Sequence, residues 1–199
     1  MASSFTYAQD ILWEKTYGGK HAEFLYDAIP TPDYGFILAG SSISGKNGNK
    51  EDNNKGDLDY WLWKMDEKGN LDWQKSFGGN QVDLLQSIAI TSDGGFILGG
   101  TSSSNKGIDK LEDCKGKEDF WVIKLNAKGQ ELWQKTIGGS DMEKLLSIAQ
   151  TKDGSYILGG TSSSNASADL EKNPFGKSED SRGNLDFWIV KLKADGSMQ

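Results

Sequence analysis

The stretch Trp73-Gln74-Lys75-Ser76-Phe77-Gly78-Gly79 decides how this sequence is read, because it is written three times. The other copies are Trp13-Glu14-Lys15-Thr16-Tyr17-Gly18-Gly19 and Trp133-Gln134-Lys135-Thr136-Ile137-Gly138-Gly139, each 60 residues away from the second. A fixed long period indicates one supersecondary unit that has been copied and stacked. Residues shared by all copies are therefore expected to build the unit, whereas residues that differ are better candidates for function.

Each copy contains four strand-like stretches, which in the second copy are residues 83–91, 96–100, 119–125 and 131–136. The sequence Ser-Asp-Gly-Gly at 92–95 is typical of a tight hairpin turn. No apolar stripe of helical period and useful length is present. We therefore predict an all-β fold of three repeats of about 60 residues, each a four-stranded propeller-type blade. A self-closed pseudo-three-fold fold, such as a β-trefoil, is the alternative.

The copies differ in length at only one loop. Gly40 to Asp59 and Gly100 to Asp119 are both steps of 19 residues, but Gly160 to Asp186 is a step of 26. Length variation confined to one loop is typical of an exposed face that carries function. The polar loops 41–58, 101–118 and 161–185 are therefore our candidate ligand-binding segments.

One repeat domain is predicted over residues 11–199, with copies at about 11–70, 71–130 and 131–199. Residues 1–10 are interpreted as a leader, because residues 5–9 look like the tail of a secretory signal behind residues added as an expression tag. An ordinary disordered leader is the alternative. The signal interpretation predicts a secreted or cell-surface protein.

Composition and charge argue against two classes of partner. The chain has a net charge of −7, and Arg182 is its only arginine. An acidic protein without arginine clusters is a poor nucleic-acid binder, and no run of 18 apolar residues is available for membrane insertion. Cys114 is alone, so no intrachain disulfide can form.

The repeated residues follow the pattern W-x-K-x-[YF]-G-G … D-G-G-[YF]-I-L-[AG]-G … D-[YF]-W-[VI]-x-K-[LM]-D-x-x-G. This pattern resembles the repeats of exported bacterial and archaeal β-propeller proteins, including surface proteins of the Bacteroidetes type. The resemblance covers residues 11 to 196 and implies a propeller fold and an exported protein. It implies little about activity, because propellers carry unrelated functions.

The copy number departs from the family, since propellers have four to eight blades and this chain has three repeats. The third copy also ends before its tryptophan strand, and an equivalent stretch, residues 11–17, stands at the front. Three explanations follow: a homodimer that completes a six-bladed ring, a single chain that closes on itself, or a slice of a longer array. In the dimer, the N-terminal strand of each copy would complete a blade of its partner.

Acidic residues are frequent in the three long loops. Because oxygen ligands near glycine suit Ca²⁺, four aspartates are candidate Ca²⁺ ligands. They are Asp57, Asp59, Asp119 and Asp186. Interleaved lysines and the lack of an EF-hand pattern favour the alternative, in which the loops are solvated and the recurring aspartates accept backbone hydrogen bonds. No other cofactor is expected.

Ligand-binding candidates come from the same loops and from one tryptophan. Trp63 is singled out because Ile123 and Val190 hold the equivalent positions, and an exposed tryptophan could stack on a sugar. Packing in the core is the alternative. The candidate residues are Trp63, Asp52, Asn54, Asp57, Asp113, Glu118, Asp180 and Asn184.

No catalytic residue is predicted. His21 is the only histidine, and the loop serines lack a nucleophile elbow. We expect a non-catalytic repeat domain that acts in binding or display at the cell surface and holds a glycan or protein ligand with its variable loops. The alternatives are a glycan-active hydrolase or lyase, which needs a carboxylate pair in one copy only, and a structural spacer of a longer surface protein.

Overall fold

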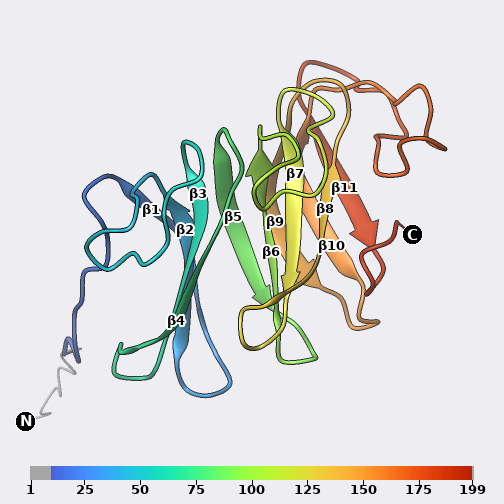
Figure 1. The fold of residues 1–199 in the computed structure, drawn as a ribbon. Coiled ribbons are helices and arrows are strands. Elements are labelled where there is room, and N and C mark those ends of the chain that lie inside the picture. Colours follow the sequence, from blue (N-terminus) through green and yellow to red (C-terminus); the bar gives the residue numbers. More distant parts are fainter. Residues whose placement is uncertain (1–9, 199) are drawn as a thin grey trace, which may run out of the picture.

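The computed structural model describes residues 10–198, and this part of the chain is all-β without a helix. Eleven strands form three antiparallel sheets (Figure 1). Sheet 1 contains β1 (Glu23–Pro30), β2 (Phe36–Ser42), β3 (Asp59–Met65) and β4 (Leu71–Phe77). Sheet 2 contains β5 (Asp83–Ile90), β6 (Phe96–Ser102), β7 (Asp119–Leu125) and β8 (Glu131–Ile137). Sheet 3 contains β9 (Glu143–Gln150), β10 (Tyr156–Ser162) and β11 (Asp186–Leu192).

Strands that follow one another in the sequence are neighbours in each sheet, so every connection within a sheet is a hairpin. The first hairpin turns contain the expected Asp-Gly signal: the Asp93 carboxylate accepts the Gly95 N–H, and Gly94 has φ of +79°. Tyr34 holds the equivalent left-handed position in sheet 1, with φ of +65°. The prediction of repeated four-stranded units is confirmed for sheets 1 and 2.

The glycines of the second strands allow an unusually close approach between strands. The first strand of each sheet carries a β-bulge, between Leu85 and Ser87 in β5. A Cβ atom on Gly100 would lie 2.0 Å from the Leu84 carbonyl oxygen beside this bulge. Only glycine fits at such a position, which explains why a glycine recurs there in every copy.

The three sheets stack face to face along the molecule, and they are not closed into a ring (Figure 1). We call the side of a sheet that carries Leu25, Leu85 or Leu145 its near face, and the opposite side its far face. One core lies between the far face of sheet 1 and the near face of sheet 2, and a second lies between sheets 2 and 3. A smaller cluster of Trp61, Trp63 and Met65 covers the near face of sheet 1.

The tryptophans of the repeat motif join one sheet to the next. The Trp73 ring of β4 meets the Phe96 ring of sheet 2 edge to face, with 5.9 Å between the ring centroids, and Trp133 meets Tyr156 in the same way at 5.8 Å. Trp13 meets Phe36 at 6.2 Å. Residues 10–22, which we call the N-terminal segment, therefore lie where the fourth strand of a preceding sheet would lie.

The N-terminal segment forms no strand in the structure, although its motif predicts one. A strand needs a hydrogen-bonding neighbour, and this segment has no third strand beside it. Sheet 3 has the reverse deficiency, because β11 has no fourth strand among the described residues. Within residues 10–198, no helix is present that is long and apolar enough to span a membrane.

Candidate functional site

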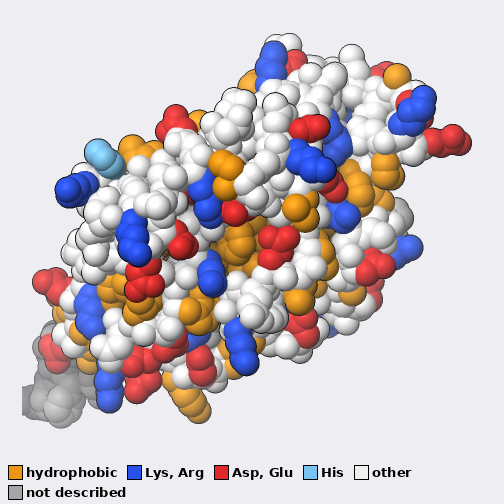
Figure 2. All heavy atoms as spheres, viewed as in Figure 1, with side chains coloured by type: hydrophobic (Ala, Val, Ile, Leu, Met, Phe, Trp, Pro, Cys, Tyr) orange, Lys and Arg blue, Asp and Glu red, His pale blue; other side chains and the backbone are white. Residues whose placement is uncertain are grey.

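The three long loops join the second and third strands of each sheet and project from one edge of the stack, opposite the short hairpin turns (Figure 1). Acidic and basic side chains are interspersed over the face of the molecule that Figure 2 shows. The loops lie beside the connections that carry the Gly-Gly pairs: the Asn49 N–H donates to the Gly18 carbonyl at 2.9 Å. Strand ends and sheet connections therefore fix the base of each loop.

A buried lysine organises each long loop. The Lys50 ammonium donates to the Ser44 carbonyl at 2.8 Å, Lys110 donates to the Ser104 carbonyl at 2.7 Å, and Lys177 donates to the Ser164 carbonyl at 2.8 Å. All three lysines are buried. Burial lowers the pKa of Lys50 and of Lys110, because the charged form loses its hydration.

A glutamine of the fourth strand completes this arrangement in sheets 1 and 2. The Gln74 Oε1 accepts the Trp61 indole N–H at 3.1 Å, and its Nε2 donates to the Asn49 carbonyl at 2.8 Å. Gln134 makes the equivalent bonds to Trp121 and to the Asp109 carbonyl, at 3.0 and 2.8 Å. The buried lysines and these glutamines were not among our predicted site residues. Lys50 and Lys110, and likewise Gln74 and Gln134, recur at a spacing of 60 residues, which was the available signal.

The recurring aspartates before the third strands are bound to backbone groups. The Asp59 carboxylate accepts the Lys55 N–H at 2.8 Å, Asp119 accepts the Lys115 N–H, and Asp186 accepts the Arg182 N–H. These bonds match the structural alternative given for them. The described residues hold no cluster of three metal-ligating side chains. Ca²⁺ binding by Asp57, Asp59, Asp119 and Asp186 stays a prediction.

Asp59 lies in a buried carboxylate pair with Asp83, at the junction of sheets 1 and 2. Burial raises the pKa of Asp59 to about 6, and the charge of Asp83 adds to this effect. Asp119 and Glu143 form the equivalent pair at the next junction, where burial raises the pKa of Asp119. A pair that occurs at both junctions, and is inaccessible at both, differs from the single pair in an open pocket that a glycosidase needs.

The predicted ligand-binding residues fall into separate places. Asn54 and Asp57 line a shallow hollow of about 490 Å³ beside His21 and Asn80. Asp113 lines a second hollow of about 390 Å³, between the second and third long loops. Asp180 lines a third, of about 410 Å³, beside β11.

The remaining candidates have structural contacts or are simply exposed. The Asp52 carboxylate accepts the Ser76 N–H at 3.1 Å, and Glu118 pairs with the Lys144 ammonium at 3.4 Å. Asn184 is exposed. The structure therefore does not bring the eight predicted residues together into one site.

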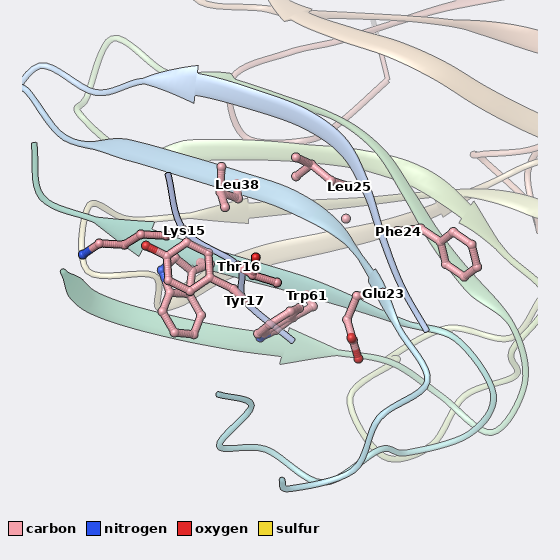
Figure 3. A pocket seen from close by; sticks show the side chains of 10 residues that line it. Lys15, Thr16, Tyr17, Glu23, Phe24, Leu25, Leu38 and Trp61 are labelled. Carbon is pink, nitrogen blue, oxygen red and sulfur yellow. The ribbon is translucent and has the colours of Figure 1, made fainter. Parts of the chain in front are cut away.

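Trp63 is buried in β3 and stacks on Tyr17, with 4.4 Å between the ring centroids. It forms part of a largely apolar cavity of about 270 Å³ on the near face of sheet 1. Figure 3 shows Lys15 and Tyr17 of the N-terminal segment on one side of this cavity, with Leu25 and Leu38 on another. Trp63 thus packs as part of a wall, with little of its ring open to solvent.

No family model matches the chain. The chain is similar to the Regulatory protein FlaEY of Caulobacter vibrioides, with 26% identity over 150 residues, which is 73% of this chain. The aligned segment covers 15% of the length of that protein.

Proposed function

We propose that this chain is a non-catalytic binding module of the exported propeller-repeat type, whose ligand is held by the long loops. One observation carries the proposal: the loops share the same buried lysine contact but present different side chains. Lys50, Lys110 and Lys177 make the same buried contact in all three loops. A constant scaffold with variable loops is the arrangement that binding proteins use to hold a ligand.

The side chains at the surface of the loops differ. The hollow at the first loop is lined by amide, carboxylate and imidazole groups, from Asn54, Asp57, Asn80 and His21. The hollow between the second and third loops has Phe175 and Asp113 in its wall. Amides and carboxylates supply both donors and acceptors for sugar hydroxyl groups. We therefore place a glycan ligand first at the Asp57 hollow, and a protein ligand second.

Export to the cell surface belongs to this proposal, and the resemblance of the repeats supports it. The similarity to a much longer regulatory protein supports a modular role within a larger chain. The alternatives are a spacer without a ligand and a glycan-active enzyme. Against catalysis, burial raises the pKa of the single Cys114 to about 12, which makes its thiol a poor nucleophile.

The test is binding of soluble oligosaccharides, measured by tryptophan fluorescence and calorimetry. We expect Asp57→Ala to weaken binding about tenfold or more, because it removes an exposed acceptor from the hollow. Glu67→Ala, at an exposed turn between β3 and β4, is the matched control and should bind as the parent does. Equal affinity of both variants would contradict the site, and no response across a broad glycan panel would favour the spacer.

A further inference from the structure

The two end faces of the stack expose residues whose counterparts are buried at the interior junctions. Leu25 on the near face of sheet 1 is 61% exposed, whereas Leu85 and Leu145 are fully buried. Phe187 on the far face of sheet 3 is 92% exposed, whereas its counterparts Tyr60 and Phe120 are fully buried. Large apolar side chains exposed in a defined pattern mark an interaction surface.

The interior junctions show what such faces bind. The Tyr60 ring of sheet 1 packs on the Trp121 ring of sheet 2, with 4.8 Å between centroids, and its hydroxyl donates to the Trp121 carbonyl at 3.1 Å. A Cβ atom on Gly100 would lie 2.4 Å from the Tyr60 hydroxyl, so this glycine opens the hole that the ring fills. Phe120 fills the equivalent hole beside Trp188, with 4.9 Å between ring centroids.

The cavity on the near face of sheet 1 corresponds to the space that an aromatic ring fills at each interior junction, but here no ring fills it. Its walls include Leu25, Gly40 and Trp61, which are the counterparts of Leu85, Gly100 and Trp121. At the other end of the stack, Phe187 is the equivalent aromatic ring, and it has no cavity of a following sheet to fill. The cavity and Phe187 lie on opposite end faces of the stack. They therefore cannot meet within one molecule of this structure, but the Phe187 of one molecule can enter the cavity of another.

The backbone shows a second pair of complementary ends. The polar hollow of about 410 Å³ beside β11 is lined by residues 177–180 and 186–189 together with Arg182. In sheets 1 and 2 the equivalent space holds the fourth strand, where Ser76 pairs with Trp61 and Thr136 pairs with Trp121. The N-terminal segment already lies in the position of a fourth strand and lacks the third strand that should pair with it.

The polar groups around this hollow also have counterparts at sheets 1 and 2. There the Glu112 carboxylate accepts the Thr136 N–H at 2.9 Å, and the Lys115 ammonium donates to the Thr136 carbonyl. Glu179 and Arg182 take these two positions in the third copy, where Thr16 of a second molecule would present the same N–H and carbonyl. Glu14 would accept the Trp188 indole N–H, as Gln134 accepts that of Trp121.

We propose that the surface formed by Phe187 and β11 binds the Leu25–Trp61 cavity and the N-terminal segment of a second copy of this chain. Residues 13–17 become the fourth strand of the third sheet of the partner. Two copies of the chain described here supply six sheets, which is within the range of four to eight blades found in propellers. Two identical head-to-tail contacts then close the ring, and no unpaired edge remains at these faces.

Absolute mass from light scattering over a concentration series tests this pairing, which does not depend on the ligand of the loops. We expect about twice the chain mass of 21.8 kDa. Phe187→Asp should raise the dissociation constant at least about thirtyfold and leave a folded monomer, because Phe187 contributes nothing to the core of its own chain. The matched control is Leu132→Asp, which places the same charge at another exposed apolar residue, one whose counterpart in sheet 1 is already Asp72.

A monomer at all concentrations would overturn the proposal, and so would an open polymer or a dimer that Phe187→Asp leaves intact. A cross-link sharpens the test by fixing the register. Lys75 pairs with Leu62 in sheet 1, so Lys15 of one copy should pair with Ile189 of the other. Directly opposed strand residues lie within disulfide range. Lys15→Cys with Ile189→Cys should form covalent dimers under oxidation, whereas neither single variant should. Absence of covalent dimer from the double variant would contradict this register.

Discussion

The interior junctions and the end faces of this stack contain the same kinds of residue in opposite surroundings. Leu85 and Tyr60 are sealed between two sheets, while Leu25 and Phe187 occupy equivalent positions and lie open to solvent. Because each sheet carries apolar side chains on both faces, it needs a neighbour on both sides. The comparison shows that apolar side chains of this fold become buried where two sheets pack together, and that a single sheet buries few of them.

Truncation of the two equivalent leucines should give the largest difference. We expect Leu85→Ala to lower the free energy of unfolding by about 2–5 kcal/mol, because it leaves a cavity in a sealed core. Leu25→Ala should change it by less than about 0.5 kcal/mol in the monomeric Phe187→Asp background, since Leu25 is exposed there. Both leucine substitutions are made in the Phe187→Asp background, and chemical denaturation of these two double variants and of Phe187→Asp itself measures both values. Equal losses would contradict the comparison.

The buried carboxylate pair should give an intermediate effect that depends on pH. Asp59 faces Asp83, Lys50 and Lys55, and burial raises its pKa from 3.8 to about 6. The folded protein therefore holds this proton longer than the unfolded chain does, and the contribution of Asp59 to stability falls as pH rises from about 4 to about 6. Above about pH 6 the Asp59 carboxyl is charged in both states, and the full free-energy cost of burying this charge remains.

Asp59→Asn removes this titration, so the stability of the variant relative to the parent should rise between about pH 4 and pH 7. We expect a rise of the order of 1–3 kcal/mol. Both substitutions are compared in the monomeric Phe187→Asp background. Asp186→Asn is the control there, because Asp186 lies at the end face and no following sheet supplies a second carboxylate. Denaturation curves across this pH range decide the outcome, and parallel pH profiles for parent and Asp59→Asn would refute the effect of burial.

The smallest effect should come from ion pairs that lie within one sheet and do not need a neighbouring sheet. The Lys124 ammonium pairs with Asp93 at 2.9 Å in sheet 2, and Lys191 pairs with Asp153 at 2.9 Å in sheet 3. Asp93→Ala should cost about 1 kcal/mol, because it leaves the buried Lys124 without a carboxylate. Asp153→Ala should cost less, because Lys191 is more exposed than Lys124 and solvent screens its ion pair.

Acid should weaken the Asp93 pair in a defined range. Burial alone would raise the pKa of Asp93, but hydrogen bonds from Thr91 and Lys124 outweigh it and lower the pKa to about 2. The stability from this pair is therefore present above about pH 4 and is lost as pH falls toward 2. Thermal melting of Asp93→Ala and the parent should converge over that range. A constant difference between them would contradict the assignment.

Much of the fold was predictable from the repeat. The spacing of the tryptophans, the Asp-Gly turns and the apolar strands predicted the hairpins of sheets 1 and 2 within a few residues at their ends. The expected strand over residues 11–17 is not formed, because a motif specifies a strand only where another strand can pair with it. Sheet 3 has the opposite deficiency: β11 could pair with a fourth strand, but no tryptophan stretch follows it among the described residues.

The candidate site was less predictable. Acidic residues in the loops suggested one ligand site or metal sites, but many of these carboxylates accept backbone hydrogen bonds that hold the loops in shape. Trp63 packs against Tyr17, a partner 46 residues away that its own sequence surroundings do not indicate. Buried lysines such as Lys110 were hidden because lysine in a polar loop is usually solvated.

The sequence by itself determined the unit: its period, its strands, its turns and the glycines that strands approach closely. These features arise from local backbone preference and from alternation along a strand, which a linear pattern records. Only the tertiary structure decided which copies of the unit are complete. Phe120 and Phe187 are the same residue type in the same motif, but one is sealed and the other open, because burial depends on what lies across the junction.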